Sequence, residues 1–157
     1  MASKILANIF DTLLRYDGEN LETRPALAES LSMSPDGTVW TFYLRRNIVF
    51  HDGTPFNAEA VKVSFDRQIN PQSGFYIGDK NVYGNSTLSM IDHTDIVDEF
   101  TVRFYLKYPY APFHHNLATC FGSSIVSPTA LRKYGSEFGR HPVGTGPFRF
   151  DSWKDGK

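Results

Sequence analysis

The sequence predicts an α+β fold, a small mixed sheet with several helices, and two kinds of pattern carry this prediction. Over Phe100–Leu106, bulky apolar residues alternate with polar ones, which is typical of a strand with one buried face. Over Asn57–Ile69, a capping residue is followed by apolar residues on one helical face. With 157 residues, the chain is expected to form a single domain, residues 1–157.

The N-terminal part is expected to begin with a helix and to reach a tight turn. Ser3 is a suitable cap for a helix over Lys4–Leu14, whose apolar residues form a broad stripe that ends at Asp17-Gly18. A short helix or turn over Ala26–Leu31 follows, and Ser34-Pro35-Asp36-Gly37 is a strong turn signal.

The central part is expected to contain two strands, a helix and a long loop. Both alternating sets of Thr38–Leu44 are bulky, which predicts a strand covered on both faces, and Ile48–Phe50 continues as a second short strand. Asn57 is a good cap for a helix over Ala58–Ile69. The polar stretch Asn70–Ser89 predicts a long loop, and loops of that length in a compact domain are often functional.

The C-terminal half is expected to continue with a hairpin and two helices. Ile91–Val97 and Phe100–Leu106 flank Asp98-Glu99, as the two strands of a β-hairpin would. Pro109–Leu117 is expected to be helical. A second helix should run from Ser127-Pro128, a cap followed by a first-turn proline, to about Tyr134.

The segment Gly144-Thr145-Gly146-Pro147 predicts a turn, and Phe148–Trp153 a terminal strand. The turn does not have the spacing of a phosphate-binding loop, because no Gly-Lys-Ser/Thr follows and the next expected element is a strand. Its glycines are better explained by a sharp turn or by a close approach to a neighbouring backbone.

Charge and cysteine content exclude several classes of function. The 16 basic and 17 acidic residues give a net charge of −1, and the densest basic stretch is the pair Arg45-Arg46, so no nucleic-acid partner is expected. Cys120 is the only cysteine, so no intrachain disulfide can form. No stretch approaches the ~20 apolar residues that span a bilayer, and the first residues lack the pattern of a leader peptide.

The histidines do not form a recognisable metal-binding pattern. His114 and His115 are adjacent, and on a helix they would point roughly 100° apart, so they would not easily chelate one ion. His51-Asp52 resembles a reactive pair, but it is better explained as a corner between a strand and the helix capped by Asn57. We expect no metal and no cofactor.

A nucleophilic enzyme remains an alternative hypothesis. Such a hydrolase would use Ser124 or Cys120 with His114 or His115. However, the stretch CFGSSIVS contains no G-x-S-x-G elbow, and nothing around Cys120 resembles a cysteine protease. From these residues alone, no catalytic residue is expected.

Several motifs occur together in a characteristic order. The stretch LAESLSMSPDGTVWTFYLRRNIVFHDGTPFNAEAVKVSFDR contains a D-G turn, a strand ending in L-R, a F-x-D-G-x-P motif and an A-E-A-V helix start, with Ala60 where the related pattern usually has Asp. This set resembles the extracytoplasmic solute-binding proteins of ABC importers, family 5, the peptide- and nickel-binding type. The resemblance continues in Asn8–Leu13, Ala111–Phe113, Ile125–Pro128 and Val143–Phe148.

The resemblance implies a particular place in a larger fold. Members of this family are much longer, and their two lobes close on a ligand. The chain is therefore expected to be a fragment of lobe I: the small subdomain of a periplasmic-binding-protein type II-like fold. Residues 1–20 and 141–157 would then be flanking segments toward the lobe core. Such a piece would expose apolar surface, so self-association is expected.

The function implied is transport without covalent chemistry, so the protein is expected not to be an enzyme. The parent would capture peptides, nickel complexes or other small solutes outside the cytoplasm and deliver them to an ABC permease in the membrane. It would be periplasmic, or extracellular and membrane-anchored. A ligand-presenting sensor protein is an alternative.

Two segments combine aromatic and small residues in the way that pockets do, and they are the candidate ligand-binding segments. They are the loop 76–83 and the stretch 120–124. The candidate residues are Tyr76, Tyr83, Phe121, Gly122 and Ser123. The resemblance itself supplies no individual ligand contact.

Overall fold

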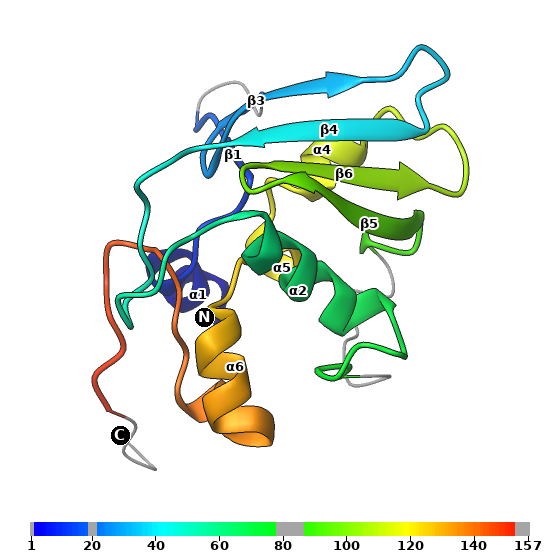
Figure 1. Cartoon of the computed structure of the whole chain (residues 1–157). Helices are drawn as coiled ribbons and strands as arrows, with labels where there is room; N and C mark the ends of the chain where they lie inside the picture. The colour runs from blue at the N-terminus through cyan, green and yellow to red at the C-terminus, as the bar shows by residue number, and fades with distance from the viewer. Residues whose placement is uncertain (1, 19–21, 78–86, 153–157) are drawn as a thin grey trace.

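A four-stranded antiparallel sheet forms the centre of the computed structural model, which describes residues 2–18, 22–77 and 87–152 (Figure 1). The strand order is β3-β4-β6-β5, so the two central strands lie far apart in the sequence. The expected α+β class is confirmed, and every strand pairing in the described ranges is antiparallel. The strands are β3 (Ala28–Met33), β4 (Val39–Leu44), β5 (Ile91–Asp98) and β6 (Thr101–Leu106).

The main core lies between one face of this sheet and α2 (Ala58–Ile69). The ring of Phe104 on β6 meets the rings of Phe65 on α2 and Phe42 on β4 edge to face, at centroid distances of 4.8 and 5.5 Å. On the opposite face, Tyr43 is 42% exposed. The expectation that β4 is covered on both faces is therefore wrong, because the helices lie on one side of the sheet (Figure 1).

Two helices begin where their capping residues predict. The side-chain oxygen of Asn57 accepts a hydrogen bond from the backbone N–H of Ala60 at 3.2 Å, which starts α2. The hydroxyl of Ser127 accepts one from Ala130 at 3.1 Å, and α6 (Pro128–Tyr134) starts there. The hairpin of β5 and β6 is also confirmed.

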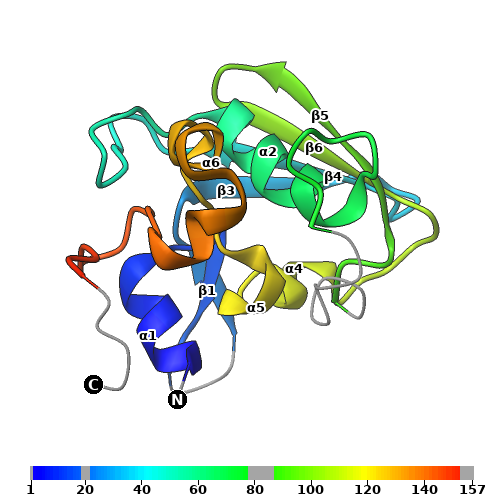
Figure 2. The same cartoon turned by 90° about the horizontal axis from the view of Figure 1, so that it is seen from below.

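A second, smaller apolar cluster lies beneath α2, where four short elements gather (Figure 2). Its buried residues come from the end of α1, from α6 and from η2, with α5 contacting both α1 and α2. The four elements are α1 (Ala2–Ile9), α5 (Cys120–Ser123), α6 and the 3₁₀ helix η2 (Gly135–Arg140), while α4 (Phe113–Asn116) contributes Phe113 to the main core.

The C-terminal segment runs against the end of α1. A Cβ atom on Gly144 would lie 2.2 Å from the carbonyl oxygen of Ile9, so only glycine allows this approach. The backbone N–H groups of Gly146 and Phe148 donate to Ile9 and Asn8, both at 2.9 Å. The expected close backbone approach at these glycines is confirmed.

The first helix is shorter than expected. It ends at Ile9, and from Leu14 the chain forms β1 (Leu14–Tyr16), which pairs with β2 (Thr23–Pro25). The apolar stripe continues past the helix because Leu13 and Leu14 are 0% and 1% exposed in the main core. Burial, and not helical periodicity, accounts for these two leucines.

Other expectations fail where pairing with a distant segment decides the structure. Ala26–Leu31 is not a helix: Ala28 onward forms β3, which pairs with β4. The expected strand Ile48–Phe50 is reduced to a single bridge, Val49 to Pro55, and the helix expected over Pro109–Leu117 is reduced to α4. Residues 148–152 form no strand, and Trp153 lies outside the described residues.

The long loop is only partly described. Residues 70–77 contain turns and no helix or strand, as expected, while residues 78–86 lie outside the described ranges. Among the helices that the structure describes, none has the length and apolar character needed to cross a membrane.

Candidate functional site

An apolar pocket opens between α1, the last turn of α2 and the chain around α5. Its volume is about 340 Å³. One charged residue, Arg67, is among its described lining residues, and most of the others are apolar. We refer to it as the apolar pocket; it is lined by Ile5, Leu6, Ile9, Phe10, Arg67, Gln68, Ile77, Gly122, Ser124, Val126, Phe138, Gly139, Pro142 and Phe150.

The pocket brings together the two segments selected from the sequence. Gly122 lines it directly, and Ile77, the neighbour of Tyr76, lines it from the other segment. Tyr76 itself is 40% exposed and does not line the pocket. Ser123 is buried, and its hydroxyl donates to the carbonyl of Asn116 at 2.9 Å, so it supports the fold of α5. Tyr83 and the side chain of Phe121 lie outside the described part of the structure.

The last turn of α2 holds both segments in place. The amide nitrogen of Gln68 donates to the carbonyl of Gly122 at 2.6 Å and to that of Ser64 at 2.9 Å. The backbone N–H of Ile77 donates to the carbonyl of Arg67 at 2.9 Å. Gly122 has a φ of 84°, a conformation that favours glycine, so this wall presents bare backbone.

Sequence reasoning missed Arg67, the charged residue of this pocket. Its guanidinium carbon lies 5.4 Å from the ring centroid of Phe138, and burial lowers the pKa of its guanidinium. No local motif marks this arginine, because the ring that it contacts is far away in the sequence. A basic residue late in a helix is ordinarily explained by the helix dipole.

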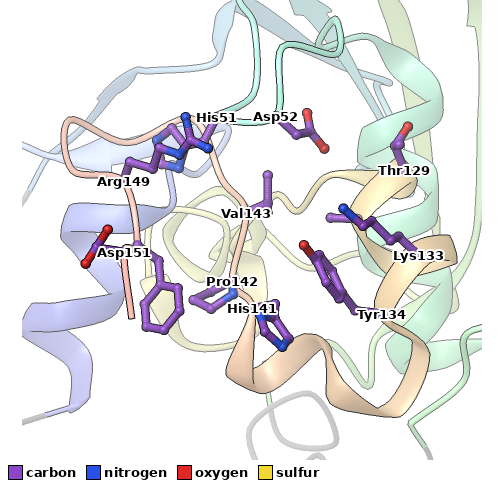
Figure 3. A pocket seen from close by; sticks show the side chains of 12 residues that line it. His51, Asp52, Thr129, Lys133, Tyr134, His141, Pro142, Val143, Arg149 and Asp151 are labelled. Carbon is purple, nitrogen blue, oxygen red and sulfur yellow. The ribbon is translucent and has the colours of Figure 1, made fainter. Parts of the chain in front are cut away.

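A second, polar pocket of about 480 Å³ lies beside α6 and shares Pro142 and Phe150 with the apolar pocket; Figure 3 shows its side chains. It is lined by residues from the turn after β4, from α6 and from the C-terminal segment. They are His51, Asp52, Thr129, Ala130, Lys133, Tyr134, His141, Pro142, Val143, Arg149, Phe150 and Asp151.

His51 and Asp52 in this polar pocket are engaged in contacts that hold the fold. The Nε2–H of His51 donates to the carbonyl of Gly146 at 2.7 Å. The carboxylate of Asp52 accepts from the hydroxyl of Ser127 at 2.6 Å and from the backbone N–H of Thr54 at 3.0 Å. Burial opposes the charged form of Asp52, but these hydrogen bonds outweigh it and hold the pKa of Asp52 below its ordinary value. The contacts agree with the structural corner expected from the sequence.

The histidines of the hydrolase hypothesis are also held by packing. His114 stacks on Trp40 at 5.7 Å and donates to the carbonyl of Ala111, and His115 stacks on Tyr16 at 5.9 Å. Burial, together with the nearby His115, lowers the pKa of His114. Within the described ranges, no group of three or more His, Cys, Asp or Glu residues is placed to hold a metal ion.

Comparison with known proteins identifies the family to which this architecture belongs. Residues 22–157 match the model of the bacterial extracellular solute-binding proteins, family 5 Middle. The glutathione-binding protein GsiB of Pectobacterium atrosepticum is 39% identical over 153 residues, which cover 98% of this chain and 28% of that protein.

Solved structures of similar proteins share the fold of this chain. The periplasmic binding protein DppA of Helicobacter pylori, in complex with the peptide STSA, is 36% identical with a TM-score of 0.82, covering 94% of this chain and 31% of that one. The protein AgaA of A. tumefaciens R10, in complex with agropinic acid, is 33% identical with a TM-score of 0.84, covering 98% and 29%.

The chain thus spans under a third of the length of each of these relatives. The match nevertheless extends over most of its own length, and the arrangement of helices and strands agrees with the neighbours' fold. This chain belongs to the bacterial extracellular solute-binding proteins, family 5.

Proposed function

We propose that the chain is part of the first lobe of a two-lobe solute receptor and that its apolar pocket forms one wall of the ligand site. One observation carries this proposal: the two segments that the sequence marks as pocket-like meet at a single pocket through Ile77 and Gly122. Apolar walls with a few polar groups are typical of small-molecule sites. Residues 1–20 and 141–157 would connect this part to the lobe core.

The receptor would capture a peptide or another small solute outside the cytoplasm and deliver it to an ABC permease. The relatives support this role, since one is named for glutathione binding and another is in complex with a peptide. Capture would use hinge closure of the second lobe over the bound ligand. The protein would be periplasmic, or extracellular and membrane-anchored.

No covalent step is part of this proposal. The His51, Asp52, His114 and His115 side chains are engaged in contacts that support the fold, so binding alone accounts for the site. Self-association of the 157-residue chain is also proposed, because large apolar side chains such as Phe148 and Val49 are 65% and 60% exposed.

A glycine substitution tests the position of the ligand wall. Gly122→Ala adds a methyl group to the pocket wall at a φ of 84°, so the affinity for the peptide Ser-Thr-Ser-Ala is expected to fall about tenfold or more. Gly53→Ala is the matched control, because Gly53 has a φ of 82° and open space around its Cβ position.

Affinity is measured by NMR titration and stability by urea denaturation. The two variants are expected to lose comparable stability, roughly 1 kcal/mol from backbone strain. The proposal predicts weaker binding in Gly122→Ala alone. Equal affinity in both variants would show that the ligand does not contact this wall.

A further inference from the structure

Arg67 carries a charge that the described part of the chain leaves without a counter-charge. It lies in the last turn of α2, half-buried, on the wall of the apolar pocket. Its Nε atom is buried and has no hydrogen-bond partner among the described residues. The adjacent carboxylate, Asp66, faces Lys62 instead, at an Oδ2–Nζ distance of 3.0 Å.

Three other arginines of the same chain have polar partners. Arg132 pairs with Glu59 at 2.5 Å, Arg24 pairs with Asp17, and the Nε of Arg45 donates to the carbonyl of Ala26 at 2.7 Å. All three are solvent-exposed, where a counter-charge contributes little. Arg67 is half-buried and therefore needs a counter-charge more than these exposed arginines do, but its side chain has no carboxylate within ion-pair distance in the described ranges.

The physical cost of this arrangement points to a missing anion. Removing a guanidinium from water without a partner is unfavourable, and the contact with the Phe138 ring compensates only in part. An arginine stays protonated under these conditions and keeps its planar fork of N–H donors. Such a fork in an apolar, concave site binds a carboxylate strongly and with defined geometry.

We propose that Arg67 recognises a carboxylate group of the ligand, so that the solute bound in the apolar pocket is a carboxylic acid such as a peptide with a free C-terminus. The inference rests on the proposed ligand site and adds the chemical class of the ligand. Arg67 would bind the carboxylate through its terminal amino groups, while the apolar wall contacts the side chains of the ligand.

The position of Arg67 favours a ligand that spans the mouth of the pocket. Its backbone carbonyl accepts from Ile77, and the next residue, Gln68, donates to Gly122, so Arg67 adjoins both candidate ligand-binding segments. No second charged residue occurs among the described lining residues. A single carboxylate is therefore the anion that this pocket fits.

Two forms of one peptide test the proposal. Ser-Thr-Ser-Ala with a free C-terminal carboxylate and the same peptide with a C-terminal amide differ in the group that Arg67 would bind. Their affinities are measured by calorimetric titration of the two-lobe protein that contains these 157 residues, because the proposed site is closed by the second lobe. The acid is expected to bind about tenfold more tightly than the amide, the effect of one charged hydrogen-bonded contact.

Three variants test whether Arg67 causes the preference for the acid over the amide. Arg67→Gln is expected to bind the acid and the amide equally, and Arg67→Lys to keep part of the preference, because the charge remains and the fork is lost. Arg132→Gln removes an exposed arginine outside the pocket and is expected to keep the full preference. Circular dichroism confirms that each variant is folded.

The guanidinium ¹⁵N–¹H signals of Arg67 give a second readout that a structural role would not move. They are expected to shift with the acid and not with the amide. Equal affinities of the two peptides for the unchanged chain, or a preference that persists in Arg67→Gln, would overturn the role of Arg67 while leaving the pocket as the ligand site. Failure of both peptides to bind the two-lobe protein would instead contradict the proposed peptide-binding function.

Discussion

Asp52 and Ser127 join two parts of the chain that are 75 residues apart, and the pair illustrates what single residues do in this fold. The hydroxyl of Ser127 donates to Asp52 while it also caps α6. The turn that contains Asp52 is thereby held against the start of α6. Asp52 is a structural residue in a polar pocket, although its sequence context resembles a reactive pair.

Replacing Asp52 tests this role through pH. Asp52→Asn is expected to lower the free energy of unfolding at pH 7 by about 1 kcal/mol or less, since the carboxylate is exposed and screened. The pKa of Asp52 in the folded protein lies below the ordinary value of 3.8. The stabilisation from the charged form is therefore fully present above about pH 4 and is lost as the pH falls through the folded-state pKa.

Urea denaturation at several pH values measures this effect. The difference between the unchanged chain and Asp52→Asn should shrink as the pH is lowered from 7 to 3. Asp151→Asn is the control, because Asp151 lines the same pocket, is exposed and shows no hydrogen bond in the described structure. A difference for Asp52→Asn that does not change with pH would contradict the assignment.

Residue-level predictions from the sequence succeed where the signal is local. Asn57 and Ser127 cap helices through hydrogen bonds that reach three residues along the chain, so composition alone reveals them. The role of Arg67 could not be predicted, because it depends on the contact with Phe138 and on the absence of a nearby carboxylate in the described structure. Both facts are properties of the folded chain.

At the scale of elements, predictions are again correct where the signal is local and wrong where the structure depends on a distant segment. The hairpin of β5 and β6 has alternating residues and a short turn, so the sequence predicts it correctly. Ala26–Leu31 was expected to be a short helix or turn, but the structure forms the edge strand β3 from Ala28, and its residues after Ala28 are exposed. Its conformation depends on pairing with β4, which no local pattern shows.

The contact between α1 and the C-terminal segment gives a test at this scale. Gly144→Ala would place a methyl group 2.2 Å from the carbonyl oxygen of Ile9, so the two segments must separate. The free energy of unfolding is expected to fall by about 1–3 kcal/mol, as in overpacked cores.

Gly74→Ala is the matched control, since nothing lies within 4 Å of its Cβ position. It is expected to change stability by less than about 0.5 kcal/mol in the same denaturation experiment. If Gly144→Ala were equally neutral, the segment would not pack against α1 as described.

At the scale of the whole molecule, the ordered set of motifs predicted the family, and the comparisons show it. The ligand-binding residues stay a prediction: the sequence selected two segments, and Ile77 and Gly122 from those segments line one pocket. Tyr76 and Ser123 do not line it, because exposure and burial decide which side chain of a segment reaches a cavity. The composition of a segment does not determine which of its side chains point into the cavity.

A crystal structure of the ligand-bound two-lobe protein that contains these 157 residues tests the central claim most directly. The account predicts that the ligand lies against the apolar pocket, in contact with Ile77 and Gly122, with its carboxylate at Arg67. A ligand bound in the polar pocket beside His51 and Asp151, or on the exposed sheet face around Tyr43, would contradict it.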